Sequence, residues 1–128
     1  HMNSLLAWGS AILILLLCCI WPLRLICANY KLKKSHSLGK LNHILRKAHC
    51  PLGFASIAAV YLHCRVAFHT TGQRSLLGAF LLVVLIALAL TGMLRRVIPK
   101  HWMRFHQILT VLLVIGTLFH SFIEFLFF

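Results

Sequence analysis

Acidic side chains are almost absent from this sequence of 128 residues, in which Glu124 is the only one. Thirteen lysines and arginines stand against it and give a formal net charge of +12. Charged residues of both signs make up only 11% of the chain, whereas hydrophobic residues make up 61%. A soluble domain of this length needs a largely polar surface, so this composition excludes an ordinary soluble domain.

Two cysteine patterns are also missing. The five cysteines are odd in number and follow no framework spacing, which argues against a disulfide scaffold. The sequence contains no Cys-x-x-Cys-His, so covalent attachment of a c-type haem is excluded. The basic residues lie beside apolar stretches and form no soluble patch, so we expect membrane lipid as a partner and no nucleic acid.

Long apolar stretches are what the chain has in place of charge. Four of them are long enough for a helix to cross about 30 Å of hydrocarbon. We therefore predict an all-α membrane protein with a single domain over residues 1–128, folded as a bundle of four transmembrane helices. The expected spans cover residues 5–26, 46–69, 76–95 and 101–126. Pro22 is expected to kink or end the first span.

Basic residues are distributed unevenly among the connections between these spans. The first and third connections, with the adjoining helix ends, hold eleven of the thirteen, and the second holds Arg65 and Arg74. Cytoplasmic loops carry the excess of lysine and arginine in membrane proteins. We therefore expect connections one and three in the cytoplasm and both termini outside, in an inner or plasma membrane. The first connection is predicted to be a solvated loop with room for one surface helical turn.

Histidine is abundant, with nine copies, although a histidine inside a membrane span is costly and usually has a partner. His49 and His63 are fourteen residues apart in the second span, and His106 and His120 are fourteen apart in the fourth. Fourteen residues of α-helix rise about 21 Å and return to within about 40° of the same face. Spans two and four run in the same direction, so each histidine of one span has a counterpart at its own depth in the other.

Two imidazoles that face each other at one depth can supply both axial ligands of a haem iron. His49 and His106 form one such level, on the cytoplasmic side, and His63 and His120 form the other. The pattern thus predicts two stacked, non-covalent haems b inside the bundle, with irons about 21 Å apart along the membrane normal.

Four glycines accompany these histidines. Gly78 and Gly92 are fourteen residues apart on the third span, which runs the opposite way, and Gly53 and Gly116 each lie about one turn from a histidine of the set. Glycine gives a flat macrocycle room to approach the backbone. Transmembrane helices also use glycine for close packing, so both explanations remain open for all four positions.

Basic side chains near the ends of the spans are candidates to bind haem propionates. Arg65 and Arg74 are the candidates on the outer side, and Arg104, Arg46 and Lys47 are the candidates on the inner side. A charge that only sets topology explains each of them equally well.

Zinc is the competing metal, because two of the histidines precede a cysteine directly, in His49-Cys50 and His63-Cys64. Neighbours on a helix point about 100° apart, and the two pairs are about 21 Å apart. They therefore cannot share one tetrahedral site.

Two segments of the chain resemble haem-binding helices of membrane b-type cytochromes. They are Arg46-Lys47-Ala48-His49-Cys50-Pro51-Leu52-Gly53, followed by His63, and His101-Trp102-Met103-Arg104-Phe105-His106-Gln107-Ile108-Leu109, leading to His120. The chain is similar to ferric-reductase-like and NADPH-oxidase-like transmembrane domains, which carry histidine pairs of this kind on two helices with one helix between them. The likeness covers residues 46–120.

The resemblance implies two haems b with those four histidines as axial ligands, and electron transfer across the membrane. Proteins of this type usually have more spans and often a flavin and NADPH module, for which this chain has no room. The expected electron donor is therefore a quinol, a small reductant or a partner protein.

The hypothesis from the sequence is thus transmembrane electron transfer, either by a small membrane oxidoreductase or by the cytochrome b subunit of one. Ferric ion, oxygen or quinone would be the acceptor. The alternatives are a metal transporter that uses histidine and cysteine ligands, and an assembly subunit without cofactor. Whether the chain is itself an enzyme stays open at this point.

Overall fold

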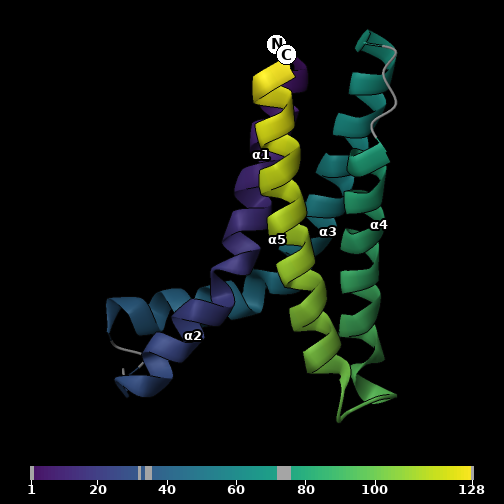
Figure 1. Cartoon of the computed structure of the whole chain (residues 1–128). Coiled ribbons are helices and arrows are strands. Elements are labelled where there is room, and N and C mark those ends of the chain that lie inside the picture. Colours follow the sequence, from purple (N-terminus) through teal and green to yellow (C-terminus); the bar gives the residue numbers. More distant parts are fainter. Residues whose placement is uncertain (1, 32, 34–35, 72–75, 128) are drawn as a thin grey trace.

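The computed structural model describes residues 2–31, 33, 36–71 and 76–127. The helices follow in the order α1 (Met2–Cys18), α2 (Ile20–Asn29), α3 (Ser37–Thr71), α4 (Leu76–Met93), the 3-10 helix η1 (Leu94–Arg96) and α5 (Trp102–Phe127). No strand occurs among these residues. The predicted all-α fold is therefore confirmed (Figure 1).

Four helical stretches in the described ranges are long and apolar enough to cross a membrane. They are Ser4–Asn29, Ser37–His69, Leu76–Arg96 and Trp102–Ile123. Large hydrophobic side chains are exposed along all four, which is unfavourable in water and favourable against lipid. The chain thus has the character of an integral membrane protein, as the composition predicts.

Pro22 explains why the first span consists of two helices. Proline has no N–H, and its ring collides with the carbonyl four residues earlier, which here belongs to Cys18. Cys18 is the last residue of α1, and α2 resumes at Ile20. In Figure 1, α2 turns away from the direction of α1, as expected for a proline-broken helix.

The second span starts earlier than predicted, because α3 begins at Ser37 and runs for 35 residues. A straight helix of that length is about 50 Å long, against about 30 Å of hydrocarbon. Figure 1 shows how the helix is accommodated: its first part lies across the bundle, and the rest rises beside α4. Pro51 lies within α3 and accounts for a bend in a helix of this length.

The prediction of a solvated loop before residue 46 is therefore wrong for residues 37–45. Apolar positions at intervals of three and four residues make this segment an amphipathic helix. The apolar side chains are Leu41, Ile44, Leu45 and Ala48, and the basic side chains of Lys40, His43 and Lys47 form an adjacent stripe whose centre lies about 120° away around the helix. The density of basic residues hid this periodicity. Leu45 is buried, whereas Leu41 and Ile44 are exposed as expected for a helix lying at the membrane interface.

Side chains hold the start of α3 in place. The backbone N–H of Leu38 donates to Nδ1 of His36 at 3.3 Å, so His36 caps the helix at the position where asparagine or serine is common. The thiol of Cys27, which is buried on α2, lies 3.7 Å from the carbonyl oxygen of Leu38. These contacts connect the start of α3 to α2.

The bundle consists of two helix pairs. α1 packs along α3 and α4 packs along α5, whereas the contacts of α3 with α4 and of α1 with α5 are sparse. No Cα atom of α3 comes within 8 Å of one in α5 in the described ranges, so these two helices lie diagonally opposite. The buried core between the pairs is apolar and consists of Ile14, Val60, Leu81, Val84, Leu85, Leu88 and Leu113.

Gly116 of α5 lies close to the side chain of Leu81 on α4. A Cβ added at this position would lie 2.5 Å from Cδ2 of Leu81, a buried core residue. Of the two explanations that the sequence leaves open for its glycines, close helix packing therefore accounts for Gly116.

Gly116→Ala is expected to lower the free energy of unfolding by about 1 kcal/mol, the lower end of the usual cost of extra volume in a packed core, because the atom it meets is the terminal Cδ2 of Leu81, which can rotate away. Gly9→Ala is the matched control, because a Cβ at Gly9 meets nothing within 4 Å. Thermal unfolding in detergent measures both, and Leu81→Val should recover part of the loss. Equal effects of the two alanine substitutions would contradict the packing assignment.

Spin labels at positions 41 and 43, which lie about 160° apart around the helix, test the interfacial position of the first part of α3. In a background without the native cysteines, a label replacing Leu41 should be relaxed by oxygen dissolved in lipid, and one replacing His43 by a water-soluble nickel complex. Both native side chains are exposed, so neither label disturbs the core. Equal access of the nickel complex to both labels would show that this segment lies free in water.

Candidate functional site

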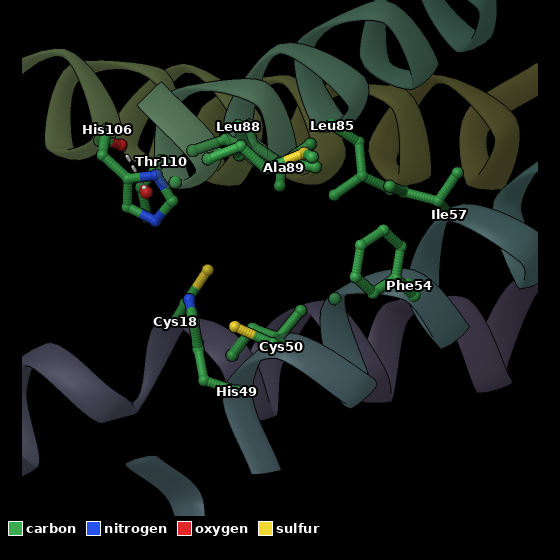
Figure 2. Close-up of a pocket in the computed structure, with 15 residues that line it drawn as sticks. Cys18, His49, Cys50, Phe54, Ile57, Leu85, Leu88, Ala89, His106 and Thr110 are labelled. Atoms are coloured by element: carbon green, nitrogen blue, oxygen red, sulfur yellow. Dashed lines mark hydrogen bonds between the residues drawn. The ribbon is translucent and has the colours of Figure 1, made fainter. Parts of the chain in front are cut away.

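Two histidines meet across the open diagonal of the bundle. His49 of α3 and His106 of α5 have ring centroids 6.0 Å apart and ring planes at 65°. Both line a cavity of about 190 Å³, which we call the His49 cavity and to which α1, α3, α4 and α5 all contribute. Figure 2 shows the two rings extending into the gap from opposite walls. The backbones of α3 and α5 do not approach each other, so only side chains bridge this distance.

The separation of the two rings suits a shared metal ion. Two imidazoles that bind one metal from opposite sides have ring centres about 6 Å apart, because each contributes a bond of about 2.0 Å and about 1.1 Å from nitrogen to ring centre. The 65° between the planes is compatible with this arrangement, since each ring can turn about its own metal–nitrogen bond.

The hydrogen bonds of the two rings differ. Nδ1 of His49 is buried and has no hydrogen-bond partner within the described ranges. Such a nitrogen costs about 1–3 kcal/mol when nothing satisfies it. Nδ1 of His106 lies 2.9 Å from the hydroxyl of Thr91, on the neighbouring helix α4. The site thus holds one anchored imidazole and one whose buried polar atom lacks a protein partner.

Glycines form part of the wall of the His49 cavity. Gly53 of α3 and Gly92 of α4 both line it, and a Cβ built on either meets nothing within 4 Å. These two glycines therefore border open space, which lets a flat ligand approach the backbone. Gly116 lines neither this cavity nor the next. The remaining wall is mostly apolar, with Leu85, Leu88 and Phe54 among its members (Figure 2).

A second cavity of about 70 Å³ lies further along the bundle and is lined by His63 of α3 and His120 of α5. We call it the His63 cavity. Gly78 of α4 lies on its wall, as its spacing from Gly92 predicts for the other level. The hydroxyl of Thr117 also reaches it, is buried, and finds no hydrogen-bond partner in the part of the chain that the structure describes.

Two buried leucines separate the cavities. Leu85 of α4 and Leu113 of α5 line both of them and are 4% and 3% exposed. The two histidine levels are therefore divided by apolar side chains that are almost fully buried.

The basic candidates lie away from both cavities. Arg65 and Arg104 are exposed and line neither cavity, and Arg46 and Lys47 are exposed as well. Arg74 lies outside the described residues. The structure therefore leaves these side chains at the surface, where they are free to set topology or to meet an anionic group at the rim.

Two residues that contact His106, Trp102 and Thr91, are not among the site residues predicted from the sequence. Trp102 precedes His106 by one helical turn, and their ring centroids lie 6.1 Å apart at an interplanar angle of 60°. That four-residue spacing is a signal that could have been used. Thr91 comes from another helix, and no pattern within the sequence links it to His106.

Groups of three or more histidine, cysteine, aspartate or glutamate side chains placed to hold a metal ion do not occur within the described ranges. His49 and His106 meet in one cavity, and His63 of α3 and His120 of α5 both line the other. Cys18 and Cys50 point into the His49 cavity from the side of His49 (Figure 2).

Comparison of the chain with protein-family models, with curated proteins and with solved structures finds no match. Functional inference therefore rests on the geometry of the two cavities.

Proposed function

We propose that this chain is a membrane cytochrome that binds two haems b and carries electrons across the bilayer. His49 and His106 are the axial ligands at one level, and His63 and His120 are the axial ligands at the other. The observation that carries the proposal is the pair of imidazoles that face each other at 6.0 Å across a diagonal where the helix backbones do not meet.

The number of ligands favours a haem over a bare metal ion. A structural zinc ion needs about four protein ligands, whereas a porphyrin supplies the equatorial nitrogens and needs at most two axial ligands from the protein. The two imidazoles at each level match the two axial ligands that a haem needs. The apolar lining and the open space at Gly53 and Gly92 suit the flat, apolar ring of the porphyrin.

The way the helices pair allows room for such a ring. Cavities of about 190 and 70 Å³ are smaller than the pockets of about 300–1,000 Å³ that usually hold small molecules. The contacts that join the α1/α3 pair to the α4/α5 pair are sparse, so the two pairs can separate without loss of their main interfaces. A bound porphyrin would therefore require the two pairs to move apart, which keeps the packing within each pair and opens the apolar core between them.

When bound, haem supplies a one-electron carrier at each level. His49 and His106 would hold one carrier and His63 and His120 the other, with the side chains of Leu85 and Leu113 between the two cavities. With two histidines at each level as its ligands, a bound haem would supply electron transfer without an open position for a substrate. We propose ferric ion, oxygen or quinone as the acceptor, and a quinol, a small reductant or a partner protein as the donor.

The surface charge fits a defined orientation in an inner or plasma membrane. Arg24, Lys40 and Lys47 are exposed on α2 and the first part of α3, and Arg95 and Arg104 are exposed near the connection of α4 to α5. In Figure 1, both groups lie toward the same end of the bundle. The positive-inside rule assigns that end to the cytoplasm.

The visible spectrum and a pyridine haemochrome assay of the purified protein test the proposal. We expect about two haems b per chain in the wild type, because each level offers two axial imidazoles. His63→Leu or His120→Leu should remove one of the two, and His49→Leu combined with His63→Leu should remove both.

His43→Leu is the matched control, because His43 also lies on α3 but is exposed and lines neither cavity. It should retain both haems. A colourless wild-type protein that binds zinc would contradict the proposal and would favour the alternative of a metal transporter. Retention of both haems in the His63 and His120 variants would show that these residues are not ligands.

Gly53→Leu should selectively remove the haem of the His49 cavity, because the new side chain enters the space that the glycine leaves open. We expect the haem content to fall from about two to about one per chain, with the axial pair of the other level intact. Gly9→Leu is the control, since it also faces open space but lines neither cavity. Unchanged haem content in Gly53→Leu would show that this glycine does not border the porphyrin.

A further inference from the structure

The hydroxyl of Thr91 on α4 connects His106 to the backbone. Oγ1 of Thr91 lies 2.7 Å from the carbonyl oxygen of Leu88 and 2.9 Å from Nδ1 of His106. Both distances are within the normal range for hydrogen bonds. The three groups therefore form a short chain from the α4 backbone to the imidazole.

Counting protons along this chain determines which atom donates at each step. A carbonyl oxygen can only accept, so the single proton of the Thr91 hydroxyl must point to Leu88. The hydroxyl oxygen then has lone pairs but no proton to offer Nδ1, and the contact at 2.9 Å requires Nδ1–H to donate to it. A neutral imidazole carries only one N–H, so Nε2 of His106 carries a lone pair.

We infer that Thr91 is a positioning residue that holds His106 in the tautomer needed to bind iron. With Nδ1 occupied by Thr91, the nitrogen left for a ligand is Nε2, and the ring extends into the His49 cavity (Figure 2). The ring of Trp102, 6.1 Å away, packs beside the imidazole and limits its rotation. When a ligating histidine donates a hydrogen bond from its other ring N–H to a second residue, the ligating nitrogen also becomes more basic.

The two imidazoles of this level are consequently not equivalent. His106 is fixed through Thr91, whereas Nδ1 of His49 is buried without a hydrogen-bond partner in the described chain. His106 is therefore the preorganised ligand of the pair. Its role as a ligand rests on the proposed function, whereas its tautomer follows from its hydrogen bonds to α4 and not from a bound haem.

Nitrogen NMR of the full chain prepared without haem tests the tautomer independently of the cofactor. With ¹⁵N-labelled histidine and the His106 signals assigned by their loss in His106→Gln, the wild type should show protonated Nδ1 and unprotonated Nε2. Thr91→Val keeps the shape of the side chain and removes the hydroxyl, so the Nδ1–H population should fall. Thr91→Ser should restore it.

Thr110→Val is the matched control for the NMR experiment. The Thr110 hydroxyl belongs to the same cavity, and its one hydrogen bond is donated to the backbone carbonyl of His106 at 2.7 Å (Figure 2). Its removal should leave the tautomer as in the wild type. A wild-type tautomer in Thr91→Val, or no recovery in Thr91→Ser, would overturn the inference.

Haem loading provides the second readout. Loss of a hydrogen bond to the second nitrogen of a ligating histidine typically weakens metal binding by about 10–100-fold. The dissociation constant of the haem in the His49 cavity should therefore rise by about that factor in Thr91→Val. The reduction potential of that haem should rise, since a less basic imidazole stabilises the ferric state less, and Thr91→Ser should reverse both changes. An unchanged potential and affinity in Thr91→Val would refute the positioning role. Absence of haem from the wild type would instead refute the proposed function, and the NMR result would still decide the tautomer.

Discussion

The separation between α3 and α5 is the constraint on which the candidate site depends. Inside lipid, a helix must satisfy its own backbone hydrogen bonds, so the backbone cannot bend inward to supply ligands. Only side chains that are long enough to meet midway between α3 and α5 can form a site shared by these two helices. His49 and His106 do so at 6.0 Å, while their backbones stay more than 8 Å apart at every Cα of the described ranges. The pairing of α1 with α3 and of α4 with α5 keeps this diagonal open.

Glycines in this bundle have different roles that depend on what lies opposite. Gly53 and Gly92 border the His49 cavity, where a methyl group would meet empty space. Gly116 instead faces Leu81 closely enough that a methyl group would force a shift in the core. One residue type thus leaves room for a ligand at one depth and allows close contact of two helices at another. Substitutions at Gly53 and Gly92 therefore alter the cavity, whereas a substitution at Gly116 alters the packing of the core.

Two prolines determine how the chain enters the bundle. Pro22 ends α1 at Cys18, and Pro51 lies in a helix too long to cross the membrane straight. The amphipathic segment of α3 that precedes Pro51 lies across the bundle (Figure 1). His49 lies just before this proline, so the position of the proposed ligand depends on where α3 turns upward. This segment and His49 therefore belong to one continuous helix.

Composition and periodicity alone determined the four spans, the kink at Pro22 and the fourteen-residue register of the histidines, because these features depend only on local hydropathy and on the pitch of a helix. The same local rules misjudged residues 37–45, where basic residues masked an amphipathic period. The tertiary structure decided which helices form pairs, that the His49 and His106 rings meet, and that Gly116 packs against Leu81. It also decided that Thr91 binds His106, since contacts between helices depend on rotation and depth, which no single helix encodes.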